Sequence, residues 1–137
     1  MEELIKILHD GNYSCVIRKD EIRTFSQRGV ADLYTLLKEE PSFLDGASVA
    51  DKVIGKGAAA LMILGKVGHI YTDVISSPAL SLLCEAGVDT KFGQTVPVIQ
   101  NRTQSDWCPL ERICYQETSA EDILPLIEGF INKMKNS

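Results

Sequence analysis

Hydrophobic and polar residues follow one another in short blocks that predict alternating helices and strands. Outside the central part of the chain, these blocks predict strands at residues 13–18, 22–26, 68–75 and 88–92, and helices at residues 4–8, 30–40, 78–86, 107–111 and 120–135. The polar turn Lys19-Asp20-Glu21 joins the first two strands, so we expect an antiparallel hairpin. A hairpin followed by alternating helices and strands is typical of a mixed sheet covered by helices.

The central stretch, residues 46–65, is the most apolar part of the chain and the richest in small residues. Apolar or small residues recur there at helical spacing: Val53, Gly57, Leu61 and Leu64. Ser48 followed by Asp51 resembles a weak capping box, and Gly65 is a typical helix stop. We therefore expect one buried helix over this stretch, with its small residues packed closely against a sheet.

Length and composition indicate one globular domain spanning residues 1–137. Hydrophobic residues make up 45% of the chain and charged residues 24%, which is ordinary for such a domain. The net charge of −5 argues against a nucleic-acid partner, because phosphate backbones require a basic surface. The longest apolar run is too short to span a membrane, and the acidic start does not resemble a signal peptide. We expect a cytoplasmic protein with no membrane partner.

Cysteine and histidine spacing does not favour a metal site. The chain has four cysteines without a C-x-x-C pair, and its two histidines are His9 and His69. Zinc sites of ordinary spacing need more ligands than this pattern offers, so we expect no metal and no cofactor. Free thiols are the default in a cytoplasmic protein.

Lys56 and Asp51 are the candidate ligand contacts of the central stretch. Lys56 stands between two glycines, where an ammonium group and an accessible backbone suit a phosphate or carboxylate. The surrounding residues do not form a P-loop. A lysine that extends its charge out of a buried helix is the alternative. Asp51 is a candidate general base or hydrogen-bond acceptor, or simply an acidic residue favoured near a helix start.

Cys108 is the candidate nucleophile. It precedes Pro109 at a predicted helix start, where free N–H groups stabilise a thiolate. Glu111, in the same turn, would oppose ionisation of this thiol. The alternative is a small buried cap, with Glu111 reaching back to the start of its own helix.

Three segments together resemble the DUF1893 family, an uncharacterised bacterial family assigned to the cytidine deaminase-like fold. The segments are DKVIGKGAAALMILG, SSPALSLLCEAGV and the later CPLE. The resemblance implies an α/β protein with a three-layer α/β/α sandwich, a mixed sheet, and a pocket between the starts of two helices. Such domains commonly form dimers or larger oligomers, so it also implies a homo-oligomer.

The resemblance implies the fold without zinc-dependent deamination. Deaminases of this fold carry H/C-A-E at one helix start and P-C-x-x-C at the next. Here the corresponding segments are Lys56-Gly57-Ala58 and Pro78-Ala79-Leu80-Ser81-Leu82, which lack the zinc ligands and the catalytic glutamate. The comparison directs attention to Asp51, Lys56, Cys108 and Glu111.

Three functions remain open from the sequence. The first is binding of a small anionic or nucleotide-like ligand in the vestigial pocket, through Lys56, Asp51, Ser77 and Glu111. The second is a metal-independent enzyme with Cys108 as the nucleophile and Asp51 or Lys56 as acid or base. The third is an oligomeric interaction or scaffold protein.

Overall fold

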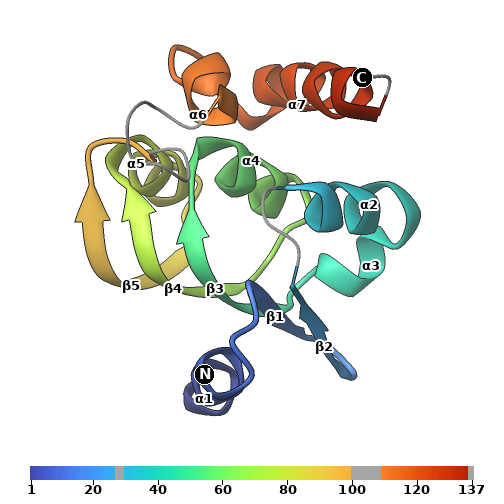
Figure 1. Ribbon diagram of the computed structural model, residues 1–137, viewed down its shortest axis with the longest axis vertical. Helices are drawn as coiled ribbons and strands as arrows, with labels where there is room; N and C mark the ends of the chain where they lie inside the picture. Colours follow the sequence, from blue (N-terminus) through green and yellow to red (C-terminus); the bar gives the residue numbers. More distant parts are fainter. Residues whose placement is uncertain (27–29, 100–108, 136–137) are drawn as a thin grey trace.

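One five-stranded sheet forms the centre of the molecule (Figure 1). The computed structural model describes residues 1–26, 30–99 and 109–135. The strands are β1 (Cys15–Arg18), β2 (Ile22–Phe25), β3 (Ser48–Ile54), β4 (His69–Ser76) and β5 (Asp89–Val96). Their order in the sheet is β2-β1-β3-β4-β5, with β1 antiparallel to both neighbours and β3, β4 and β5 parallel. The predicted hairpin, mixed sheet and α/β class are confirmed.

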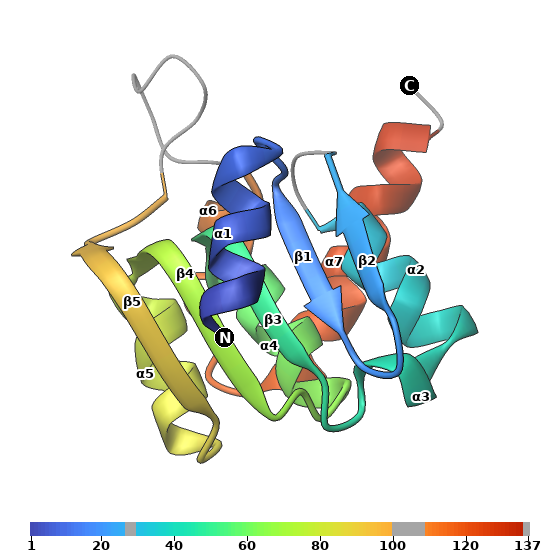
Figure 2. The ribbon, with the colours of Figure 1, turned by 90° about the horizontal axis from the view of Figure 1, so that it is seen from below.

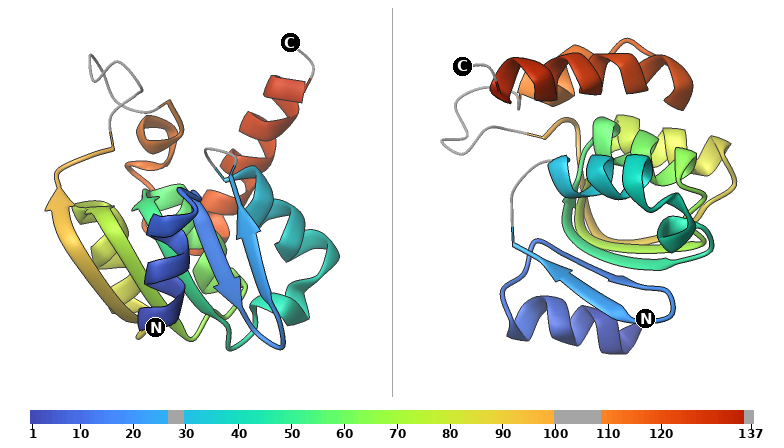
Figure 3. Two further views of the ribbon diagram at one scale, coloured as in Figure 1. Left: turned by 60° about the horizontal axis from the view of Figure 1, so that its bottom comes forward. Right: turned by 90° about the vertical axis from the view of Figure 1, so that its right-hand side faces the viewer.

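Helices cover both faces of the sheet, unequally. They are α1 (Glu2–Asp10), α2 (Ala31–Glu39), α3 (Pro41–Leu44), α4 (Lys56–Leu64), α5 (Ser77–Glu85), α6 (Pro109–Cys114) and α7 (Ala120–Lys135). Of the described helices, α1 alone lies on one face, in contact with β1 and β3 (Figure 2). The helices α2, α4 and α5 lie on the other face, and α6 and α7 pack outside α4 (Figure 3). The α/β/α arrangement thus carries an additional outer pair of helices.

The main hydrophobic core lies between the sheet and α4. Nearly all of α4 is buried, from Lys56 to Met62, because the sheet lies on one side and α7 on the other. A smaller core beneath α1 consists of Leu4, Leu8, Val16 and Ala50. Burial of α4 on opposite sides explains why its sequence shows no polar face.

The prediction of one helix over residues 46–65 is wrong in its first half. Residues Ser48–Ile54 form β3, and α4 begins only at Lys56. As a central strand covered on both faces, β3 lacks the polar alternation that identifies a half-buried strand. Gly55 separates the two elements with an extended backbone. Ser48 and Asp51 therefore form no capping box, and Asp51 lies in a strand.

The other predicted helices are confirmed, with small shifts of their ends, except that residues 107 and 108 of the helix predicted at 107–111 lie outside the described residues. Ser76 caps α5, since its Oγ accepts the N–H of Ala79 at 3.3 Å, and Ser119 accepts the N–H of Asp122 at 3.1 Å at the start of α7. Pro41 begins the short helix α3, which the sequence pattern did not predict. The strand predicted at residues 88–92 extends as β5 to Val96.

One irregularity crosses the three parallel strands at the same level. Val49 and Ile54 both face the main core, although strict alternation would place residues five apart on opposite faces. Strand pairing skips Lys52, Asp73 and Gly93. A Cβ atom on Gly93 would lie 2.9 Å from the carbonyl oxygen of Asp73, so this position requires glycine.

The irregularity sets the side-chain directions in β5. Phe92 pairs with Thr72, which precedes the skipped residues, and Thr95 pairs with Ile75, which follows them. Residues that pair across adjacent strands point to the same face of the sheet, and Thr72 and Ile75 point to the face that α5 covers. Phe92 and Thr95 therefore both lie on the α5 side of β5.

Candidate functional site

A buried carboxylate, that of Glu111 in α6, lies against the start of α4. Its side chain is only 2% exposed. Oε1 accepts the N–H of Lys56 at 3.2 Å and the hydroxyl of Ser76 at 3.3 Å, and Oε2 accepts the N–H of Ile99 at 3.3 Å. The first N–H groups of a helix lack partners within the helix and form the positive end of its dipole. Glu111 therefore fills the anion position at the start of α4.

Gly55 makes room for this carboxylate. A Cβ atom at Gly55 would lie 2.7 Å from Oε2 of Glu111, closer than a side chain tolerates. The glycine in front of Lys56, which the sequence associates with close approach of a ligand, here permits close approach of the protein's own carboxylate.

Lys56 is also engaged within the protein. Its side chain is buried, and Nζ donates to the backbone carbonyl of Tyr115 at 2.7 Å. Burial raises the pKa of Glu111, whereas the N–H groups of Lys56 and Ile99, the Ser76 hydroxyl and the Lys56 charge act in the opposite direction. The cluster of Lys56, Ser76 and Glu111 thus contains one ammonium and one carboxyl group that offset each other. Direct contact of Lys56 with a ligand stays a prediction.

A surface hollow adjoins this cluster at the start of α5. We call it the α5 hollow; it has a volume of ≈ 580 Å³ and is lined by Ser77, Pro78, Ser81, Thr95, Val96, Pro97 and Tyr115. Ser77, a predicted ligand residue, lies in its wall and donates a hydrogen bond from Oγ to the carbonyl of Val96 at 3.3 Å. Tyr115 connects the hollow to Lys56.

Asp51 belongs to a different environment. It pairs across the sheet with Cys15, and its Oδ1 accepts the N–H of Val53 at 3.3 Å. Burial raises the pKa of Asp51 to about 7, although N–H groups of its own strand and the Cys15 thiol lower it. Burial and Asp51 together raise the pKa of Cys15 well above its usual value. None of the contacts described for Asp51 joins it to Lys56 or Glu111.

The nucleophile hypothesis rests on Cys108, which lies outside the described residues. Of the other cysteines, Cys15 and Cys114 are buried and Cys84 is exposed. Within residues 1–26, 30–99 and 109–135, no three histidine, cysteine, aspartate or glutamate side chains gather closely enough to hold a metal ion. In the same part of the chain, no helix is both long and apolar enough to cross a membrane.

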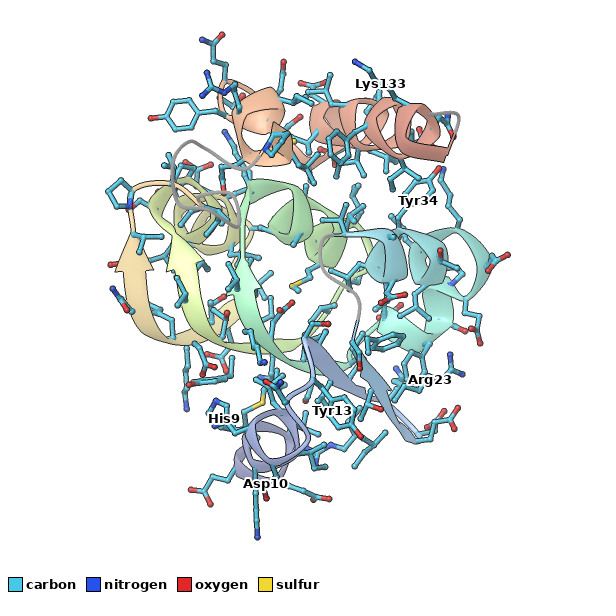
Figure 4. All side chains as sticks on the ribbon, viewed as in Figure 1. His9, Asp10, Tyr13, Arg23, Tyr34 and Lys133 are labelled. Atoms are coloured by element: carbon cyan, nitrogen blue, oxygen red, sulfur yellow. The ribbon has the colours of Figure 1, made fainter. Side chains whose placement is uncertain are left out.

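Other polar clusters connect elements at the surface. Tyr34 of α2 donates from its hydroxyl to Glu128 of α7 at 2.7 Å, and Figure 4 shows its side chain between these helices. His9 of α1 contacts Asp73 of β4 at 2.9 Å. Arg23 lies over the ring of Phe43, 4.0 Å from its centre, and bonds Glu40. These contacts explain how helices attach to the sheet and to each other.

Sequence reasoning missed Ile99 and Tyr115 as parts of the site. Both contribute backbone groups, whose use does not depend on residue type and leaves no signal in the sequence. Ser76 was recognisable only as part of a helix entry, because a serine before Ser77-Pro78 suits an N-cap.

Comparisons with known proteins agree with the resemblance seen in the sequence. The chain is similar to the crystal structure of a DUF1893 family protein (TM1506) from Thermotoga maritima, with a TM-score of 0.86 and 26% sequence identity. The similarity covers 93% of this chain and 87% of that chain. No curated protein matches. Neither the family description nor this structure names a deaminase, so that part of the resemblance stays a prediction. The family model described as domain of unknown function (DUF1893) matches residues 3–131, and the chain therefore belongs to this family.

Proposed function

We propose that this protein binds a small nucleotide-like ligand, and that the uncharged, nucleoside-like part of the ligand occupies the α5 hollow. The observation that carries the proposal is the position of the hollow at the carboxyl ends of the parallel strands β4 and β5. Ligands of open α/β sheets bind outside this end of the strands. The volume of ≈ 580 Å³ suits a small molecule.

The lining of the hollow matches the chemistry of a nucleoside. Ser77, Ser81 and Thr95 provide hydroxyl groups that both donate and accept hydrogen bonds, as sugar hydroxyls and base edges require. Apolar surface for a ring comes from Pro78, Val96, Pro97 and Tyr115. Among the described residues of the lining, none is charged, which favours an uncharged group there.

Glu111 and Lys56 support the placement of the uncharged part of the ligand in the α5 hollow and of its charged part away from the start of α4. The anion position at the start of α4 already holds the Glu111 carboxylate, so a phosphate there would meet like charge. Lys56 acts as a positioning residue because its ammonium group holds the backbone of Tyr115, which lines the hollow.

A blocking substitution tests the proposal. Ser81→Phe fills the α5 hollow, whereas Ser42→Phe places the same ring in a second, charged hollow beside β2 and α3. We expect at least one of the four ribonucleosides or their monophosphates to raise the melting temperature of the wild type and of Ser42→Phe, but not of Ser81→Phe. At a ligand concentration of 100 Kd, the gain is about 2.7 kcal/mol, or roughly 8 °C. The proposal fails if none of these ligands stabilises the wild type, or if Ser81→Phe responds equally.

A further inference from the structure

Among the described residues, no strand pairs with the outer edge of β5. β5 is the last strand in the order β2-β1-β3-β4-β5, and Figures 1 and 2 show no described element beyond it. Its eight residues are exposed or half-buried along their whole length. The outward N–H and C=O groups of such an edge are available to another strand.

β5 is less protected against pairing than β2, although Lys91 lies near its start and the irregularity at Gly93 interrupts it. β2, at the opposite edge, is only four residues long, contains Arg23, and follows the charged turn Lys19-Asp20-Glu21. In contrast, β5 carries charges only at Asp89 and Lys91, near its start. The run from Phe92 to Val96 has no charge and no proline. Long, uncharged edges of this kind pair readily.

We propose that β5 pairs with β5 of a second copy of this chain, antiparallel and about a two-fold axis, joining the two sheets into one. Residues facing each other across an antiparallel pair share a face. Phe92 and Thr95 both lie on the α5 side of β5, so Phe92 of one copy faces Thr95 of the other. Gly93 then faces Gln94, and the irregularity of one strand coincides with that of the other.

The same register explains why the occupant is a second copy. A two-fold contact requires a surface that complements itself, and this register pairs the uncharged run with itself. Asp89 and Lys91 of the two copies then lie at opposite ends of the paired segment. The exposed positions of α5, which packs on β5, are Ser77, Ser81, Cys84 and Glu85, so three of the four are small. Pairing would also cover Phe92, which is 41% exposed.

Pairing would bring the ring of Phe92 from the second copy beside Thr95, in the wall of the α5 hollow. An aromatic ring there would offer a stacking surface to a nucleoside base. This consequence rests on the proposed function, whereas the pairing of β5 does not.

Molar mass in solution tests the pairing. The full chain has a mass of 15.1 kDa, so light scattering after size exclusion should give about twice this value for the wild type at 100 µM. Phe92→Lys and Gln94→Lys place a charge within the paired run and should give the monomer mass. Thr24→Lys, in the protected edge strand β2, is the matched control and should remain dimeric. Circular dichroism establishes that each variant is folded.

Two results would overturn the pairing: a wild type with the monomer mass at 100 µM, or folded Phe92→Lys and Gln94→Lys variants that both remain dimers. The nucleoside melting experiment is read separately. A dimer that binds no nucleoside leaves the pairing intact, and a monomer that binds one leaves the proposed function intact.

Discussion

Glu111 joins its own helix α6 to groups from three other segments of the chain. Its carboxylate accepts hydrogen bonds from Lys56, Ser76 and Ile99, and all three contacts lie in buried or half-buried surroundings. Removing an acceptor from buried donors costs their full desolvation penalty, because no replacement partner is available.

We therefore expect Glu111→Ala to lower the free energy of unfolding by about 2–4 kcal/mol. Glu111→Gln should cost less, since its amide oxygen still accepts one of these hydrogen bonds. Urea denaturation followed by circular dichroism measures both. The control Glu85→Ala, at an exposed position of α5, should change stability by less than about 0.5 kcal/mol. Equal losses for Glu111→Ala and Glu85→Ala would show that the buried carboxylate stabilises nothing.

Asp51 makes stability depend on pH. Burial raises its pKa from 3.8 to about 7, so between about pH 4 and pH 7 the folded protein binds a proton that the unfolded chain has lost. The contribution of Asp51 to the free energy of unfolding therefore falls as pH rises through this range.

Asparagine at this position cannot ionise, so Asp51→Asn should gain stability relative to the wild type between pH 5 and pH 8. Urea denaturation of both proteins at the two pH values measures the difference, in which Asp73, Glu111 and other titrating groups common to both largely cancel. A difference that is the same at pH 5 and pH 8 would contradict the buried, protonated state of Asp51.

At the residue scale, the sequence identified unusual residue types better than their roles. Lys56, Asp51 and Glu111 are polar residues in apolar surroundings, and the structure buries all three. Their partners could not be predicted, because Lys56 contacts a backbone carbonyl and Glu111 reaches across to the start of another helix.

At the element scale, the two capped helices α5 and α7 differ in what their capping serines do. Ser119 accepts one N–H group at an exposed helix start. Ser76 accepts the N–H of Ala79 and also donates to Glu111 in a buried position. A comparison of the two serines therefore distinguishes the contribution of a helix cap alone from that of a cap that also takes part in a buried hydrogen-bond network.

We expect Ser119→Ala to lower the free energy of unfolding by about 1 kcal/mol and Ser76→Ala by about 2 kcal/mol or more. The larger loss follows because Glu111 would lose a hydrogen-bond donor as well. Chemical denaturation of the two variants under one set of conditions gives the comparison. If Ser76→Ala costs no more than Ser119→Ala, the contact between Ser76 and Glu111 contributes little.

The junction of β3 and α4 shows why one element was missed. Val53 continues the helical spacing of Gly57 and Leu61 by coincidence, and this merged a strand with the following helix. α4 is buried on opposite sides, and the polar residues Ser48, Asp51 and Lys52 of β3 do not alternate with its apolar ones. Neither element therefore shows the regular polar spacing that distinguishes a period of two from one of 3.6. The β-branched residues Val49, Val53 and Ile54 were the available signal for a strand.

At the scale of the whole molecule, the order of elements was enough to predict an α/β protein with a mixed sheet. Hairpin pairing and parallel strands follow from short-range connections. The outer layer of α6 and α7 was not predictable, because it depends on α4 being apolar on opposite sides. The location of the hollow likewise depends on how α5, β5 and Tyr115 meet in space.

The central claim is that ligand binds in the α5 hollow while Glu111 keeps the start of α4 filled. A nitrogen-15 NMR titration of the full chain with the nucleoside that raises its melting temperature tests this most directly. The account predicts amide shift changes at Ser77, Ser81, Thr95 and Tyr115, with the Lys56 amide, which donates to Glu111, unchanged. Shift changes centred on Gly55 and Lys56 with the hollow unaffected, or no changes at saturating nucleoside, would contradict it.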